Sequence, residues 1–228
     1  MDANGELQSV VISGSHYSGK ELLDKLDELV NTAYFHKEYT AEKEYASDFL
    51  WYLWCGPKSP LYGKDKMAFF ERYYLEDESL YKEKYNDYYH FSESEEVCGR
   101  ILRMFGIEES RGHIVNGHVP VKIKNGESPV KAGGKLFVID GGISKAYQKA
   151  TGIAGYTLIY DSHSLALAVH KPFISGKSEH TPDIQLVEKL ECRANISDTD
   201  IGEELLEKIQ DLRELLYAYR TGMMKEGV

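Results

Sequence analysis

Two histidines, His113 and His118, bracket a short apolar segment and are the side chains of this sequence best placed for chemistry. A separation of five residues puts them on opposite faces of a regular strand, so we do not expect them to chelate one ion together. His118 follows Gly117, where the backbone can turn sharply and aim the ring into a cleft beside a sheet edge. Neutral imidazole is a common ligand of first-row metals. His118 is therefore a candidate metal ligand, with an exposed loop residue as the alternative.

Asp140 and a group of lysines are the other polar features of this region. Asp140 ends an apolar segment and could either orient a ligand or cap the following turn. The lysines make a locally basic surface on an acidic protein, which suits an anionic small substrate but is equally explained by a solvated loop. They are Lys122, Lys124, Lys131, Lys135 and Lys145. The sequence contains no Walker loop, HExxH motif, EF-hand loop or Ser/His/Asp order.

The composition is that of a globular protein, with 228 residues of which 42% are hydrophobic. A formal net charge of −10 argues against a nucleic-acid groove and a polybasic membrane surface. The three cysteines are far apart and form no CxxC pair, so we expect free thiols in a reducing compartment. We find no apolar run long enough to span a bilayer and no signal-peptide pattern, and we expect a cytoplasmic protein.

Hydrophobic periodicity predicts a helix-rich segment over residues 14–110. A capping box of Ser92 with Glu95 is expected to start its last helix, which ends at Gly106. Many of the 17 tyrosines crowd into this segment, where core packing and a subunit contact explain them equally well. The elements that we predict are a strand at 7–13 and helices following Ser18, over 41–54 and over 65–75.

The sequence pattern over residues 111–195 is typical of strands and predicts a sheet-rich segment. Strands are predicted at 113–116, 119–124, 135–139 and 184–193, with a hairpin of 156–160 and 165–170 across residues 161–164. A terminal helix is predicted over 199–222, with apolar positions at helical spacing. No linker is evident, and we expect residues 1–228 to form a single unit.

Several distinctive segments together cover nearly the whole chain. One is HIVNGHVPVK at residues 113–122, continued by KNGE at 124–127. The others are LWYLWCG at 50–56, SPL at 59–61, FERY at 70–73, GKLFVIDGG at 134–142, TGIAGYTL at 151–158 and DTDIG at 198–202. These segments are similar to signatures of class III (Firmicutes-type) fructose-1,6-bisphosphatases.

That family resembles the calcineurin-like metallophosphoesterases, whose dinuclear metal centre lies at the mouth of a β-sandwich. The resemblance implies an α/β fold: the C-terminal part of such a sandwich, flanked by helices, with a helix-rich first half. Their loops are DxH, GDxxDRG, GNH and a late GH, and Gly117-His118 matches the last. His118 is thereby implied to bind a divalent metal, Mn²⁺ or Mg²⁺. The implied reaction is hydrolysis of the 1-phosphate of fructose 1,6-bisphosphate, where two cations would bind the phosphate and generate hydroxide.

The resemblance also suggests which residues contact phosphate. In related phosphatases a basic residue soon after a tryptophan-bearing strand does so, which makes Lys64 a candidate, with Lys66 and Arg72 behind it. Lys122, beside His118, is a further candidate. The same comparison makes residues 51–54 a strand, against the helix that their periodicity predicts.

GDxxDRG and GNH do not occur in the sequence, and its one DxH string, Asp161-Ser162-His163, lies at the predicted hairpin turn after Gly117-His118 rather than ahead of it, so the bridging aspartate, the asparagine ligand and the acid histidine of such a site are missing. We therefore expect a truncated protein, a separate gene fragment or one piece of an interrupted gene, and no catalysis by these residues alone. The alternatives are an inactive sugar-phosphate-binding remnant and an assembly module. In the latter, the tyrosine-rich helices would pair with another subunit or with a complementing N-terminal half.

Overall fold

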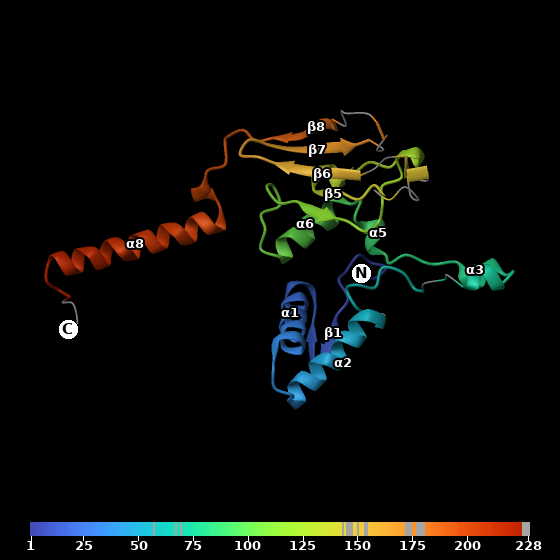
Figure 1. Cartoon of the computed structure of the whole chain (residues 1–228), viewed down its shortest axis with the longest axis horizontal. Helices are drawn as coiled ribbons and strands as arrows, with labels where there is room; N and C mark the ends of the chain where they lie inside the picture. Colours follow the sequence, from blue (N-terminus) through green and yellow to red (C-terminus); the bar gives the residue numbers. More distant parts are fainter. Residues whose placement is uncertain are drawn as a thin grey trace. The chain divides into compact units, whose positions relative to one another are not determined.

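The protein has a mixed α/β fold in the computed structural model, which describes residues 1–56, 58–66, 68, 70–142, 144, 148–149, 151–152, 155–171, 175–176 and 181–224 (Figure 1). The chain divides into two compact units, Met1–Asp140 and Gly141–Val228, whereas the sequence suggested a single unit. Within the described ranges, no helix is long and apolar enough to cross a membrane.

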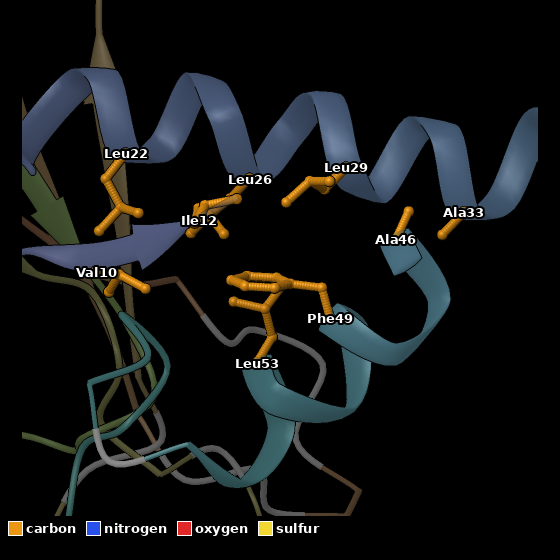
Figure 2. Packing of buried hydrophobic residues seen from close by; sticks show 9 residues of the cluster. All are labelled: Val10, Ile12, Leu22, Leu26, Leu29, Ala33, Ala46, Phe49 and Leu53. Carbon is orange, nitrogen blue, oxygen red and sulfur yellow. The ribbon is translucent and has the colours of Figure 1, made fainter. Parts of the chain in front are cut away.

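The core of the first unit lies between two helices and a short hairpin. Strand β1 (Val10–Ile12) pairs antiparallel with β2 (Ser15–Tyr17), and α1 (Gly19–Phe35) and α2 (Ala41–Cys55) follow. The apolar positions of α1 recur every three or four residues and face β1 and α2 (Figure 2). The buried cluster consists of Val10, Ile12, Leu22, Leu26, Leu29, Ala33, Ala46, Phe49 and Leu53.

Helix α2 runs through residues 51–54, so the strand that the family resemblance implied there is wrong and the helix is confirmed. In a strand, residues two apart share a face, whereas Trp51 is 71% exposed and Leu53 only 9%. Leu53 shares its buried face with Phe49, four residues earlier, as a helix requires. The Thr40 hydroxyl caps the helix by accepting a hydrogen bond from the Lys43 backbone N–H at 3.2 Å.

The helix predicted over 65–75 is wrong except for its final turn. Residues 63–65 are instead bound to a distant segment: Lys64 forms a β-bridge with Tyr85, and the Asp65 N–H donates to the Lys84 carbonyl at 2.9 Å. A backbone N–H committed to this bridge cannot join a helical ladder. The helices here are short: α3 (Glu71–Tyr74), α4 (Glu78–Tyr81) and α5 (Tyr88–Phe91).

The N-cap of helix α6 (Glu95–Met104) lies two residues later than predicted. Ser94, rather than Ser92, is the N-cap, and its hydroxyl accepts from the Val97 N–H at 3.4 Å. Ser92 is buried and donates to the Tyr89 carbonyl instead. Gly106, with φ of 73°, lies just beyond the helix, as predicted.

A three-stranded sheet follows in the first unit. Strand β5 (Leu136–Val138) is central, with β3 (Ile114–Asn116) parallel to it and β4 (Val130–Lys131) antiparallel. The strand predicted over 119–124 is wrong, because Pro120 has no N–H to offer a ladder and the Lys122 N–H donates to the Glu127 carboxylate at 2.9 Å. The chain there forms a loop ending in a 3₁₀ turn, η1 (Ile123–Asn125).

The second unit contains an antiparallel sheet in the order β6 (Gly155–Tyr160), β7 (Ser164–His170) and β8 (Asp183–Lys189). The predicted hairpin is confirmed, and the Asp161 carboxylate holds its turn by accepting from the backbone N–H groups of His163 and Ser164. A 3₁₀ turn, η3 (Ile196–Asp198), leads into the predicted terminal helix, α8 (Asp200–Arg220).

Candidate functional site

His118 lies in a tight turn directly after β3. Its φ of 70° is in the left-handed region, and the Val119 N–H donates to the Gly117 carbonyl at 2.9 Å, closing a three-residue turn around it. Such a backbone costs a residue other than glycine roughly 1–3 kcal/mol, and it persists only where the surroundings impose it. The side chain is exposed at this end of the strand. The exposed imidazole is accessible to a metal ion, and its role as a ligand remains a prediction.

The turn is held in place by the sheet on both sides. The Ile139 N–H donates to the Asn116 carbonyl at 2.9 Å, and the Val121 N–H donates to the Asp140 carbonyl at 2.8 Å. Val121 is buried, so the loop is fastened to the sheet immediately after His118. Asp140 therefore supports the His118 loop through its backbone, while the choice between turn capping and ligand orientation for its carboxylate stays open.

His113 is part of the packing of the sheet. Its Nδ1 lies 3.1 Å from the Gly134 carbonyl oxygen, and its ring centroid is 5.3 Å from that of Phe137, which is fully buried. A ring engaged in this way is less available to a ligand than the exposed ring of His118.

The candidate phosphate contacts Lys64 and Arg72 converge on Glu83, which our sequence reasoning did not single out. The Lys64 ammonium donates to Oε2 of Glu83 at 2.8 Å, and an Arg72 guanidinium nitrogen lies 3.7 Å from the same oxygen. The hydrogen bond raises the pKa of Lys64 and, together with the Ala68 N–H, lowers the pKa of Glu83. Lys66 donates to the Leu80 carbonyl at 2.9 Å. The structure thus brings all three predicted basic residues against the segment that carries Glu83.

A sequence signal for this cluster was available. Residues 64–66 read Lys-Asp-Lys and residues 82–84 read Lys-Glu-Lys, so opposite charges meet when the segments pair with an offset of one residue, as they do where Lys64 lies opposite Tyr85. Recognising the signal required knowing that the segments pair, and 15 residues lie between them.

A row of tyrosines connects the cluster to the end of β3. The Lys64 ammonium lies 5.2 Å from the Tyr85 ring centroid, and Tyr85 and Tyr88 each contact Tyr89 edge to face. Asn116, two residues before His118, donates from its amide to the Tyr88 hydroxyl at 2.8 Å. Burial raises the pKa of Tyr88. Tyr88 and Tyr89 therefore pack within the unit, whereas Tyr85 is 46% exposed and Tyr34, Tyr39, Tyr73 and Tyr74 are exposed as well.

A pocket of about 370 Å³ adjoins this row, within the size range of small-molecule sites. Gly63, next to Lys64, lines it together with Tyr88 and Tyr89. The remaining wall is largely apolar and includes Leu7, Leu22, Leu61, Ile101 and Phe105.

The basic surface predicted around Lys122 is partly neutralised. Lys131 forms an ion pair with Glu93 at 2.9 Å, and the Lys135 ammonium lies 3.9 Å from a Glu95 carboxylate oxygen. Lys122 and Lys124 have exposed side chains, and Lys145 lies outside the described residues.

The described residues do not fit a complete metal centre. Among them, no three His, Cys, Asp or Glu side chains are grouped closely enough to hold a metal ion. A single imidazole is fewer protein ligands than a catalytic divalent metal takes. We therefore derive no catalytic step through a metal from this chain.

Comparison with known proteins decides the family. The family model described as Firmicute fructose-1,6-bisphosphatase matches residues 1–221. The chain belongs to this family. The resemblance that the signature segments indicated is thereby confirmed.

Curated relatives named fructose-1,6-bisphosphatase class 3 are similar over the whole chain. That of Bacteroides fragilis is 52% identical over 234 residues, covering 100% of this chain, and that of Bacteroides thetaiotaomicron is 51% identical over the same length. A Clostridium botulinum relative is 51% identical over 232 residues and covers 99% of the chain. The chain spans only 35% of the length of each relative. No solved structure matches the chain.

Proposed function

We propose that this chain is part of a cytoplasmic fructose-1,6-bisphosphatase that hydrolyses fructose 1,6-bisphosphate to fructose 6-phosphate and phosphate in gluconeogenesis. The observation that carries the proposal is the family match over residues 1–221, supported by relatives about 50% identical that bear this name. We also propose a calcineurin-like β-sandwich for the whole enzyme. The sheets described in this chain are small, and the chain spans 35% of the length of its relatives, so the sandwich is a proposal about the longer protein.

In the whole enzyme we assign His118 as one ligand of a divalent metal, Mn²⁺ or Mg²⁺. The support is its exposed ring and its left-handed backbone, because strained backbone conformations concentrate at functional sites. We assign Lys64, Lys66, Arg72 and Lys122 to the phosphates of the substrate. Lys64 and Arg72 have the strongest support, since an ammonium and a guanidinium within reach of one carboxylate oxygen can also hold a phosphate.

The chain by itself should be catalytically silent. The described residues contribute one proposed metal ligand, and a single ligand cannot hold the cations that generate hydroxide. Phosphate release from fructose 1,6-bisphosphate with added Mn²⁺ should equal the blank without protein. Turnover that survives repurification and disappears on chelation would contradict this.

The test of His118 uses an active, longer relative with substitutions at the aligned positions. His118→Ala should lower kcat by on the order of a hundredfold or more, because a ligand is lost from the metal that stabilises the transition state. His118→Gly should be equally inactive while removing the backbone strain, which separates loss of the ring from a folding defect. His113→Ala is the comparison at a structural histidine and should cost far less activity.

Activity and its Mn²⁺ dependence are measured for all three variants, with circular dichroism to check folding. If His113→Ala is inactive while His118→Ala keeps near-normal activity and metal dependence, the assignment of the ligand is wrong.

The second candidate function is assembly, and helix α8 is the observation that favours it. Apolar residues along α8 recur at alternating steps of four and three, the spacing of a coiled-coil seam, and all are exposed. They are Leu205, Ile209, Leu212, Leu216 and Tyr219. We propose that this stripe pairs with a second copy of the chain, giving a dimer or a larger species.

Light scattering at micromolar concentration tests the pairing. Lys208 and Arg213 flank the seam, and in a parallel pair Lys208 of one copy would face Arg213 of the other. Because salt screens the repulsion between these like charges, association should strengthen as the salt concentration is raised. Leu212→Lys should give a monomer. A monodisperse monomer at every salt concentration would favour the remaining occupant, a complementing part of the longer enzyme.

A further inference from the structure

The carboxylate of Glu83 receives the kind of donors that a phosphate group would receive. Oε2 accepts from the Lys64 ammonium at 2.8 Å and lies 3.7 Å from Arg72, while Oε1 accepts from the Ala68 backbone N–H at 3.1 Å. Ammonium, guanidinium and backbone N–H groups are the common ligands of phosphate oxygens in proteins. The anion now in this position is a side chain of the chain itself.

The charges around this carboxylate are not balanced. Two cations, Lys64 and Arg72, share one anion, so the group retains a net positive charge with Glu83 in place. The Lys64 and Arg72 side chains are 37% and 55% exposed, whereas that of Glu83 is 15% exposed. An anion from solution can therefore reach both cations, and a phosphate, with more charge and more acceptor oxygens than a carboxylate, is a stronger partner for them.

The pairing of residues 63–65 with residues 84–86 does not use the Glu83 carboxylate. Lys64 and Tyr85 form the β-bridge, the Asp65 N–H donates to the Lys84 carbonyl, and the Asn86 N–H donates to the Gly63 carbonyl at 2.9 Å. These bonds keep Glu83 opposite the cations when its side chain changes rotamer. Departure of the carboxylate is therefore a side-chain movement that leaves the two paired segments in place.

We infer that Lys64, Arg72 and the Ala68 N–H form a phosphate-binding cradle that the Glu83 carboxylate occupies, so that an incoming phosphate must displace Glu83. The inference rests on the proposed function only in taking that phosphate as one of the substrate's. Glu83 acts as a built-in competitor that weakens anion binding and keeps the cations in position while the cradle holds no phosphate.

The experiment is a calorimetric titration of the whole 228-residue chain with inorganic phosphate at pH 7 and low salt. Glu83→Gln keeps the shape of the side chain and removes its charge, and it should bind phosphate roughly fivefold to tenfold more tightly than the wild type. Glu76→Gln makes the same change in net charge at an exposed acid of the same loop, and its affinity should rise less than twofold.

Two further variants keep the result interpretable. Lys64→Met combined with Glu83→Gln should lose the gain, because the cradle then lacks its closest donor. Glu83→Asp keeps the charge but shortens the reach toward Lys64, and it should show a smaller gain even if Glu83→Gln folds poorly by circular dichroism.

Folded Glu83→Gln and Glu83→Asp that bind phosphate no more tightly than the wild type would overturn the inference. A gain that persists without Lys64, or that Glu76→Gln reproduces, would overturn it as well. The proposed function is judged separately, because phosphate binding to the chain needs neither metal nor turnover. An active longer relative whose Glu83→Gln variant keeps the wild-type KM would contradict the cradle while leaving the phosphatase assignment intact.

Discussion

Helices α1 and α8 both carry leucines at helical spacing, and the two apolar stripes are covered to very different extents. In α1, Leu22, Leu26 and Leu29 are buried against β1 and α2 (Figure 2). In α8, Leu212 is 64% exposed, and only Gly202 is buried.

The difference lies in what surrounds each helix. A hairpin precedes α1 and α2 follows it through a short connection, whereas α8 follows the sheet of its unit and packs on the short turn η3. An apolar stripe predicts a helix with a face to bury, but it does not say what covers that face.

The largest effect should come from truncating a covered leucine. Leu26→Ala should lower the free energy of unfolding by about 2–5 kcal/mol, because it removes buried methyl groups and leaves a cavity. The matched change on α8, Leu212→Ala, should alter it by less than about 0.5 kcal/mol in the monomeric chain. Urea unfolding followed by circular dichroism measures both. A loss above 1 kcal/mol for Leu212→Ala in a monomer would mean that the chain itself covers α8.

A smaller effect is expected at the junction where α8 packs on η3. A Cβ at Gly202 would overlap the Ile196 carbonyl oxygen, so Gly202→Ala must move η3 away from the start of the helix. Forced displacement of packed backbone typically costs about 1–3 kcal/mol. We expect faster hydrogen exchange at the start of α8 and an unchanged unfolding transition of the first unit. A shift of that first-unit transition would contradict the local role of this junction.

The smallest effect should appear in the sheet of the second unit, whose packing contrasts with the exposure of α8. Tyr156 is buried in β6, its hydroxyl has no hydrogen-bond partner in the described part of the chain, and burial raises its pKa to about 12. An acid with a raised pKa in the folded state destabilises the protein once the unfolded chain ionises, which begins near pH 10. Stability should therefore fall by about 1 kcal/mol as the pH rises to 11. Tyr156→Phe should remove this part of the alkaline loss and should be at least as stable as the wild type at pH 7. Equal slopes for both proteins would show that Tyr156 does not titrate in this way.

Local patterns in the sequence determined the elements that depend on neighbouring residues. Apolar spacing and Thr40 specify α2, Asp161 specifies the turn between β6 and β7, and the Gly117-His118 pair marks the turn after β3. In each case the interacting groups lie within a few residues of one another. Such patterns were even sufficient to contradict the strand that a resemblance implied for residues 51–54.

Tertiary structure decided whatever depends on a distant partner. Residues 63–65 are not helical because they pair with residues 84–86, and Glu83 meets Lys64 and Arg72 only through that pairing. The covered stripe of α1 and the exposed stripe of α8 differ for the same reason. A helix, a cap or a turn is stabilised by bonds between residues close in the chain, whereas a cluster of charges or a covered face exists only after remote segments have met. The sequence alone does not say which remote segments those are.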